Sequence, residues 1–175
     1  MDLERVLKGS PWTFNNHVLM LHWPEKKEDP LKVPLIFACF WVQIHEVPPS
    51  FYIETLAHQI EGFLGNFLEF DGTNLGKGLC TYLHVREQLD VRRPLKMKNK
   101  VMFSVVACSY VSFKYERLTL FCFFYGRLGH SDSFCQAKMA LGFDVAEMGW
   151  DLSLRAQSRR ALALAVYGYE KIGKG

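Results

Sequence analysis

Residues 122–135 read CFFYGRLGHSDSFC, which follows the zinc-knuckle spacing C-x2-C-x4-H-x4-C except that a tyrosine holds the second cysteine position. The three expected zinc ligands are Cys122, His130 and Cys135, and Tyr125 stands in the fourth ligand position. A segment this short has almost no core, so about four N or S ligands around one tetrahedral Zn²⁺ must supply its folding energy. The spacing therefore predicts a degenerate zinc knuckle.

Two glycines agree with this interpretation, because Gly126 follows the second ligand position and Gly129 precedes the histidine. A tight loop around a metal needs positive φ at such points, which glycine adopts without steric cost. Tyr125 weakens the expected site, since a phenol has a pKa near ~10 and binds zinc less well at neutral pH than a thiolate does. We therefore expect Zn²⁺ in a three-ligand site of reduced affinity. The alternative is an accidental grouping of two cysteines and a histidine on an apolar strand and turn.

The chain has 175 residues, 49% of them hydrophobic, which suits one globular unit or two small ones. A net charge of +3 does not by itself identify a nucleic-acid-binding protein, so the distribution of charge carries more information. Basic residues cluster before position 101, and five of them are candidate phosphate contacts: Arg92, Arg93, Lys96, Lys98 and Lys100. Within the knuckle, Arg127 is a further basic candidate and Phe123 is the candidate for stacking on a base.

The five cysteines occur without a signal-peptide pattern. We therefore expect thiols in an intracellular, reducing compartment rather than a disulfide framework, with the choice of nucleus or cytoplasm open. Apolar runs fall short of the ~20 residues that a membrane-spanning helix needs, so no membrane partner is expected. The sequence contains no phosphate loop, paired-carboxylate motif or other recognisable catalytic constellation, which argues against an enzyme and against a small-molecule substrate.

The hydrophobic patterns predict an α+β fold, in which a small antiparallel sheet with a packed helix is followed by the degenerate knuckle and a C-terminal helix. The expected helices cover residues 3–7, a stretch after Ser50 whose apolar stripe runs from Leu56 to Phe67, and residues 152–165. The expected strands cover residues 17–23, 36–47, 83–92, 101–106 and 109–115. Alternation over 83–92 indicates a half-exposed strand broken near Glu87, and residues 96–100 are expected to form a charged loop.

Four blocks outside the knuckle carry a resemblance to a known family. They are SPWTF at 10–14, FWVQIHEVP at 40–48, LDVRRPLK at 89–96 and YVSFKYE at 110–116. Together with the knuckle, and in this order, they resemble retrotransposon-derived, gag-like plant proteins in which a domain of unknown function precedes a C-x2-C-x4-H-x4-C zinc knuckle. The resemblance spans residues 3–160, and in it this chain begins inside the upstream domain, without that domain's first helix and strands.

The pattern and the resemblance divide the chain into four expected parts. These are a remnant of an upstream α+β domain and linker (1–35), an α+β domain (36–118), the knuckle-like segment (119–136) and a tail with a basic helix (137–175). We expect a nucleic-acid-binding protein of the zinc-knuckle type and of retrotransposon origin, with single-stranded RNA or DNA as its partner. The alternatives are a gag-like structural protein that self-associates and an element remnant without function.

Overall fold

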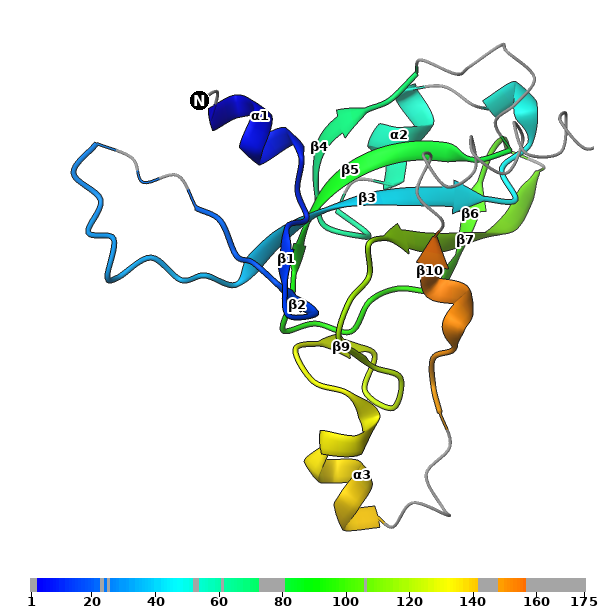
Figure 1. The fold of residues 1–175 in the computed structure, drawn as a ribbon. Helices are drawn as coiled ribbons and strands as arrows, with labels where there is room; N and C mark the ends of the chain where they lie inside the picture. The colour runs from blue at the N-terminus through cyan, green and yellow to red at the C-terminus, as the bar shows by residue number, and fades with distance from the viewer. Residues whose placement is uncertain are drawn as a thin grey trace, which may run out of the picture.

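The computed structural model describes residues 3–22, 24, 26–51, 54–60, 62–72, 81–105, 107–141 and 148–156. Within these residues the chain is mostly β-sheet, and the helices are short (Figure 1). The α-helices are α1 (Leu3–Lys8), α2 (Glu54–Ile60) and α3 (Gln136–Leu141), and 3-10 turns cover Pro49–Phe51, Asp132–Phe134 and Leu152–Leu154. The prediction of an α+β fold with a packed helix and a C-terminal helix is therefore wrong. In the described ranges, none of the helices is long and apolar enough to cross a membrane.

The main sheet has the strand order β10–β7–β3–β5–β4, with β6 also pairing with β7. Its strands are β3 (Phe37–His45), β4 (Asn66–Phe70), β5 (Leu83–Asp90), β6 (Lys98–Met102), β7 (Cys108–Glu116) and β10 (Arg155–Ala156). All of these pairs are antiparallel except β10 with β7, which is parallel and places Arg155 opposite Tyr115. A separate two-residue hairpin joins β1 (Thr13–Phe14) to β2 (His17–Val18), so the strand expected over residues 17–23 is much shorter than predicted.

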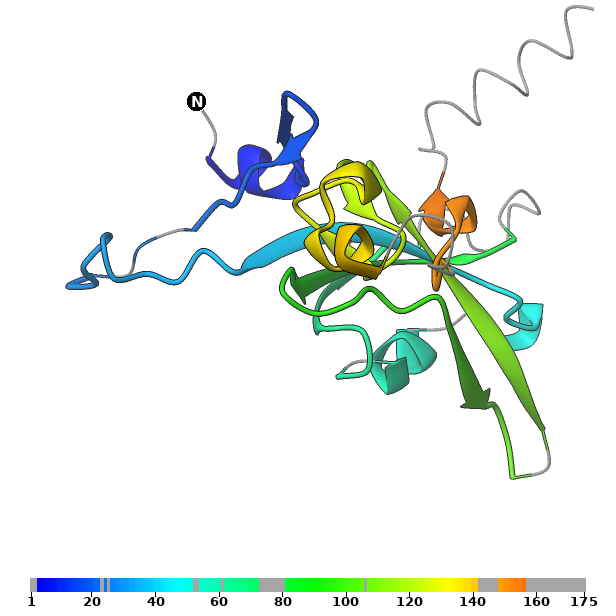
Figure 2. The same ribbon diagram turned by 90° about the horizontal axis from the view of Figure 1, so that it is seen from below.

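The core lies on one face of this sheet. Strand β3 buries Phe40, Val42 and Ile44 completely, as the apolar run over residues 36–47 predicts. Helix α2 lies against one side of the strands (Figure 2), and its Leu56 and Ile60 join the same apolar cluster. The sheet is therefore held together by ordinary burial of apolar side chains.

Helix α2 ends at Ile60, well before the end of the predicted apolar stripe, and Phe67 belongs to β4. Two glycines explain the difference. Gly62 has a φ of +79° and donates its N–H to the Gly65 carbonyl over 3.0 Å, which turns the chain back. A Cβ at Gly65 would lie 2.3 Å from the Gln88 carbonyl oxygen, so only glycine lets the chain approach β5 this closely. The glycines terminate the helix and start a strand.

Strand β5 is continuous and buried on both faces, so the predicted half-exposed and broken strand is wrong. It pairs with β3 on one edge and with β4 on the other, which places it inside the sheet. Its polar side chains are buried beside polar partners: His84 lies 3.2 Å from Glu116, and Arg86 donates to the Ser10 hydroxyl over 2.9 Å. The alternation of polar and apolar residues in β5 therefore does not mark an exposed face. Both faces of the strand are buried, and they differ in whether polar or apolar side chains line them.

The predicted C-terminal helix begins instead as a 3-10 turn, in which the Asp151 side chain accepts a hydrogen bond from the Ser153 amide over 2.7 Å. Strand β10 follows it and pairs with the part of the β7 edge that β6 leaves unpaired, while Leu154 is buried in the core. The rest of the predicted helix, residues 157–165, lies outside the described residues, as does most of the turn-rich connection before β5.

Candidate metal centre

The three sequence-predicted zinc ligands meet in one place. Strand β8 (Phe121–Cys122) pairs with β9 (Arg127–Leu128) in a short hairpin below the main sheet, followed by the turn that leads into α3 (Figure 1). The ligand atoms of Cys122, His130 and Cys135 all lie within 4.8 Å of one another. Ligands bound to a tetrahedral Zn²⁺ at 2.0–2.3 Å lie less than about 4 Å apart, so only a small closure separates this arrangement from a metal site.

The backbone of the hairpin turns around Cys122. Gly126 and Gly129 have φ values of +71° and +102°, which confirms the sequence argument for positive φ at both glycines. Gly126 donates its N–H to the Cys122 carbonyl over 2.7 Å, and the Tyr125 N–H lies 3.4 Å from Cys122 Sγ. An N–H directed at a ligand sulfur stabilises the thiolate that a metal requires.

Both cysteine side chains are fully buried and His130 is half-buried. Burial raises the pKa of the Cys122 thiol, while the amides of Tyr125 and Phe124 lower the pKa and the neighbouring Cys135 raises it. Metal binding must therefore release a proton from this site, as it does at thiolate sites in general. Two sulfurs and one imidazole nitrogen form a donor set that zinc accepts, so the residues present fit this metal.

Tyr125, in the fourth ligand position, has the surroundings of a surface aromatic residue. Its side chain is 41% exposed, its ring packs edge-on against Phe124 with centroids 5.5 Å apart, and the Arg127 guanidinium carbon lies 5.5 Å from the ring centroid. A cation over an aromatic face is attracted by the ring quadrupole. These contacts are those of a surface aromatic residue and not those of a buried metal ligand.

An open groove of ≈ 610 Å³ lies beside the ligands, between Tyr125 and Phe134, with His130 in its lining. The sequence offers Phe134 as a further knuckle aromatic beside the stacking candidate Phe123, and the structure leaves the Phe134 side chain 76% exposed. In the sequence, Phe134 is marked by its position directly before the candidate ligand Cys135. In the structure it ends a 3-10 turn that leaves its side chain exposed. Two exposed aromatic rings beside a metal-ligand cluster provide a surface on which a planar ring can stack.

The stacking candidate Phe123 is half-buried. The Phe123 and Phe121 ring centroids lie 5.0 Å apart, and the Arg155 guanidinium carbon lies 5.9 Å from the centroid of the Phe123 ring. Phe121 itself is buried in the sheet core. Phe123 thus lies between the knuckle and the sheet, and its role in stacking stays a prediction.

The five basic candidates before the knuckle are all exposed. Lys98 and Lys100 lie on strand β6, so the expected charged loop ends earlier than predicted. Arg92 donates to both oxygens of Asp90 over 2.9 and 2.7 Å, and this hydrogen bonding lowers the pKa of the Asp90 carboxyl to about 2. Arg93 lies further from the same carboxylate, at 3.6 Å. Arg92 is therefore the member of the cluster whose charge is already matched.

The loop between β5 and β6 carries Arg92, Arg93 and Lys96 and is named the basic loop. It is attached to the knuckle through Leu95. The Leu95 amide donates to the Gly126 carbonyl over 2.8 Å, and the Trp150 indole N–H donates to the Leu95 carbonyl over 2.8 Å. The Trp150 ring packs so closely on the turn that a Cβ at Gly126 would lie 2.3 Å from it. Loop, knuckle and Trp150 therefore form one connected surface, although they lie far apart in the sequence.

Comparisons with known proteins agree with this location. A family model described as a zinc knuckle matches residues 89–137, which include the basic loop and all three candidate ligands. An uncharacterized protein of Arabidopsis thaliana is 28% identical over 136 residues, which cover 77% of this chain and 42% of that protein. The chain thus spans less than half the length of this curated relative. No solved structure matches the chain. A zinc-knuckle domain is therefore present, and the chain has a plant homologue.

Proposed function

We propose that this protein binds single-stranded nucleic acid through a zinc-knuckle module. The observation that carries the proposal is the grouping of Cys122, His130 and Cys135 within 4.8 Å, inside a segment that matches a zinc-knuckle family. Zn²⁺ held by these three residues would order the segment, because in so small a unit metal binding supplies folding free energy. The substitution at Tyr125 leaves the fourth position to water or another donor, and so weakens zinc binding.

The surface around the metal ligands suits an unpaired strand. Exposed bases stack on aromatic side chains while lysine and arginine neutralise the phosphates, without a need for base-specific hydrogen bonds. In this chain Tyr125 and Phe134 offer the exposed rings, and Arg127 offers positive charge beside the Tyr125 ring. In this proposal the protein binds nucleic acid without catalysing a reaction on it, and the family match to a zinc knuckle supports such a binding role.

The basic cluster contributes more affinity than the knuckle in this proposal. It offers Arg93, Lys96, Lys98 and Lys100 as exposed charges beyond the Asp90-bound Arg92, whereas the knuckle offers Arg127. Each phosphate neutralised on a single strand contributes roughly 0.7 units to the slope of log affinity against log salt concentration. The slope is therefore the measurement that locates the contact surface.

The test replaces Arg93, Lys96 and Lys98 together with alanine. We expect the salt slope for a labelled oligonucleotide to flatten by about two units if all three contact phosphate. The matched control replaces Lys26, Lys27 and Lys32 with alanine, which removes the same charge from an exposed loop. An unchanged slope in the cluster variant, with binding intact, would show that the contact surface lies elsewhere. Equal flattening in both variants would show that the slope depends only on the net charge of the protein.

Origin and organisation belong to the same proposal. We propose a retrotransposon-derived, gag-like protein of an intracellular, reducing compartment, with an N-terminal segment (1–35), a sheet domain (36–118), the knuckle segment (119–136) and a basic tail (137–175). The domain match and the plant homologue support the knuckle part of this description.

A self-associating structural role is the second candidate, and one observation favours it. The far ends of β6 and β7 extend beyond the other strands (Figure 2), and exposed apolar side chains lie on these ends (Met102, Tyr110) and in the connection between them (Val105). Exposed apolar groups near a strand edge promote association between chains. Sedimentation of the protein alone would detect this, and apolar association should persist at salt concentrations that abolish oligonucleotide binding.

A further inference from the structure

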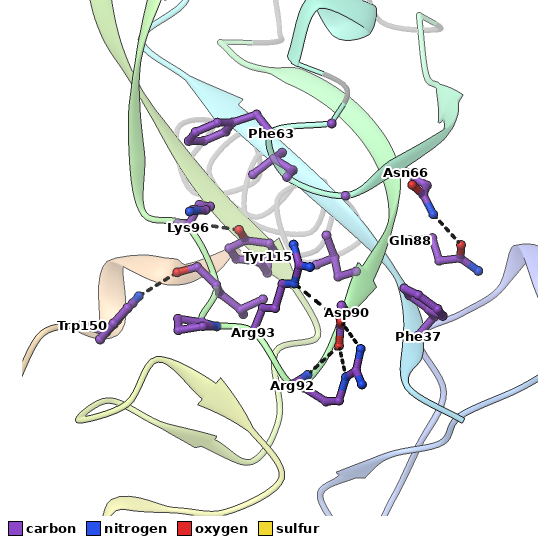
Figure 3. Close-up of a pocket in the computed structure, with 16 residues that line it drawn as sticks. Phe37, Phe63, Asn66, Gln88, Asp90, Arg92, Arg93, Lys96, Tyr115 and Trp150 are labelled. Atoms are coloured by element: carbon purple, nitrogen blue, oxygen red, sulfur yellow. Dashed lines mark hydrogen bonds and ion pairs between the residues drawn. The ribbon is translucent and has the colours of Figure 1, made fainter. Parts of the chain in front are cut away.

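A cavity of ≈ 750 Å³ opens on the sheet beside the basic loop (Figure 3). Its walls are the turn at residues 62–66, the end of β5 and the loop at 91–96. The volume falls within the range of roughly 300–1,000 Å³ that is usual for small-molecule sites. The candidate metal ligands Cys122, His130 and Cys135 do not line it.

The cavity combines apolar rings with a polar amide pair. Phe63 and Trp150 lie on one side of the lining, and Asn66 and Gln88 lie on the other (Figure 3). Asn66 donates its amide N–H to the Gln88 side-chain oxygen over 3.1 Å. Each amide has both donor and acceptor groups, so the pair retains hydrogen-bonding capacity for a ligand edge. Such a lining suits a flat ring with polar atoms along one edge.

Charge in the lining is mainly positive. Arg92, Arg93 and Lys96 lie there with the carboxylate of Asp90, and that carboxylate is bound by Arg92 in two hydrogen bonds. The Arg93 side chain is 84% exposed and lies in the middle of the group in Figure 3. The Lys96 ammonium lies 5.3 Å from the centroid of the Phe63 ring. An anionic group at the mouth of the cavity would therefore meet two exposed cations next to an aromatic face.

We propose that this cavity receives one unpaired base of a single strand, with the adjoining phosphates held by Arg93 and Lys96. The inference rests on the proposed function, since it gives the same strand a second contact besides the knuckle. The base packs beside Phe63 and its polar edge meets Asn66 and Gln88. Recognition of an unpaired base by stacking and edge hydrogen bonds is available only when the base is outside a duplex.

The position of the cavity makes a continuous path for the strand. Trp150 lines the cavity and also packs on Gly126 in the knuckle turn. Leu95 lines it as well and accepts the Trp150 indole N–H while donating to the Gly126 carbonyl. The cavity and the knuckle therefore share a wall, and a strand that leaves one passes the cations of the loop before it reaches the other.

The test compares two strands with the same number of phosphates, an oligothymidylate and an abasic strand, on wild type and on Asn66→Ala. Asn66 is exposed on strand β4, so the substitution removes a hydrogen-bonding edge without opening the core. We expect Asn66→Ala to weaken oligothymidylate binding by about fivefold, the scale of one net hydrogen bond, and to leave abasic binding unchanged. Asn99→Ala is the matched control, because Asn99 lies on β6 outside the cavity lining.

Photo-crosslinking of a bromouracil-substituted strand supplies a second measurement. The inference expects crosslinked peptides from residues 62–66 or 88–96 as well as from the knuckle. Crosslinks confined to residues 121–137, or an Asn66→Ala loss that is equal for both strands, would overturn the cavity and leave the proposed function standing. Failure of the wild-type protein to bind either strand at low salt would overturn both.

Discussion

The main sheet and the knuckle are stabilised in different ways. In the sheet, Phe40, Ile44 and Phe113 are almost completely buried and belong to one apolar cluster. In the knuckle, the fully buried side chains are the candidate ligands Cys122 and Cys135, while Tyr125 and Phe134 are exposed. Burial of large apolar side chains stabilises the sheet at any metal concentration, whereas the proposed zinc site would make the stability of the knuckle depend on bound metal.

The two regions are nevertheless joined, because Phe121 and Trp150 pack against the apolar cluster of the sheet. Hydrogen bonds from Leu95 to Gly126 and from Trp150 to Phe123 fix the knuckle turn against the basic loop. These contacts hold the knuckle turn against the sheet independently of any metal. The sheet should therefore survive loss of the knuckle, while the knuckle should not survive loss of the sheet.

Phe113→Ala should have the largest effect on both regions. Its side chain is 1% exposed, and truncating a buried phenylalanine costs about 3–5 kcal/mol of unfolding free energy, from lost burial and the remaining cavity. We expect urea denaturation to show this loss and zinc retention to fall with it. Tyr110→Ala on the same strand is the control, since its side chain is 63% exposed and should cost less than about 0.5 kcal/mol. A similar cost for the two variants would mean that the sheet is not the stable unit.

Trp150→Ala should have an intermediate effect that falls mainly on the knuckle. Trp150 is half-buried, so we expect a loss of about 2 kcal/mol, below the 3–5 kcal/mol of a fully buried aromatic residue. Zinc affinity should fall too, because the turn around Cys122 loses its support at Gly126. Chelator competition and urea denaturation on the same protein give both values. Leu152→Ala, on an exposed side chain nearby, should leave both unchanged. Lower stability with unaltered zinc affinity would show that the attachment does not hold the metal site.

Short-range patterns predicted what depends on neighbouring residues. Ligand spacing located Cys122, His130 and Cys135, and the glycines between them have the expected positive φ. The apolar runs located β3 and most of β7. In each case the residues that determine the structure lie within a few positions of one another, so the sequence displays the cause directly.

Structure that depends on distant residues was not predictable in this way. The apolar stripe from Leu56 to Phe67 fits a helix, but Gly65 must leave space for the Gln88 backbone, and the chain becomes β4. Likewise Arg155 enters the sheet because β6 leaves the end of one β7 edge unpaired, which no local pattern reveals. The cavity is lined by residues far apart in the chain, among them Asn66 and Gln88 at 22 positions from each other, so it has no sequence signature.

Tyr125→Cys should have the smallest effect on the sheet and the most specific effect on the knuckle. Tyr125 is a partly exposed turn residue, so the unfolding free energy of the sheet should change by less than about 0.5 kcal/mol. The new thiolate completes the tetrahedral donor set, so zinc affinity should rise by more than about tenfold. Residues that only hydrogen-bond to metal ligands already change metal affinity by about tenfold or more, and a direct ligand should contribute at least as much. Chelator competition and zinc content per chain by native mass spectrometry measure this directly.

The control for that change is Tyr125→Ser, which removes the phenol ring without adding a thiolate. If zinc affinity rises equally in both variants, relief of the bulky side chain explains the gain and the three-ligand account loses its support. If wild type and Tyr125→Cys bind zinc equally, the fourth position takes no part in binding. A gain confined to the cysteine variant, with the sheet unaffected, would show that metal ligation sets the stability of the knuckle while apolar burial sets that of the sheet.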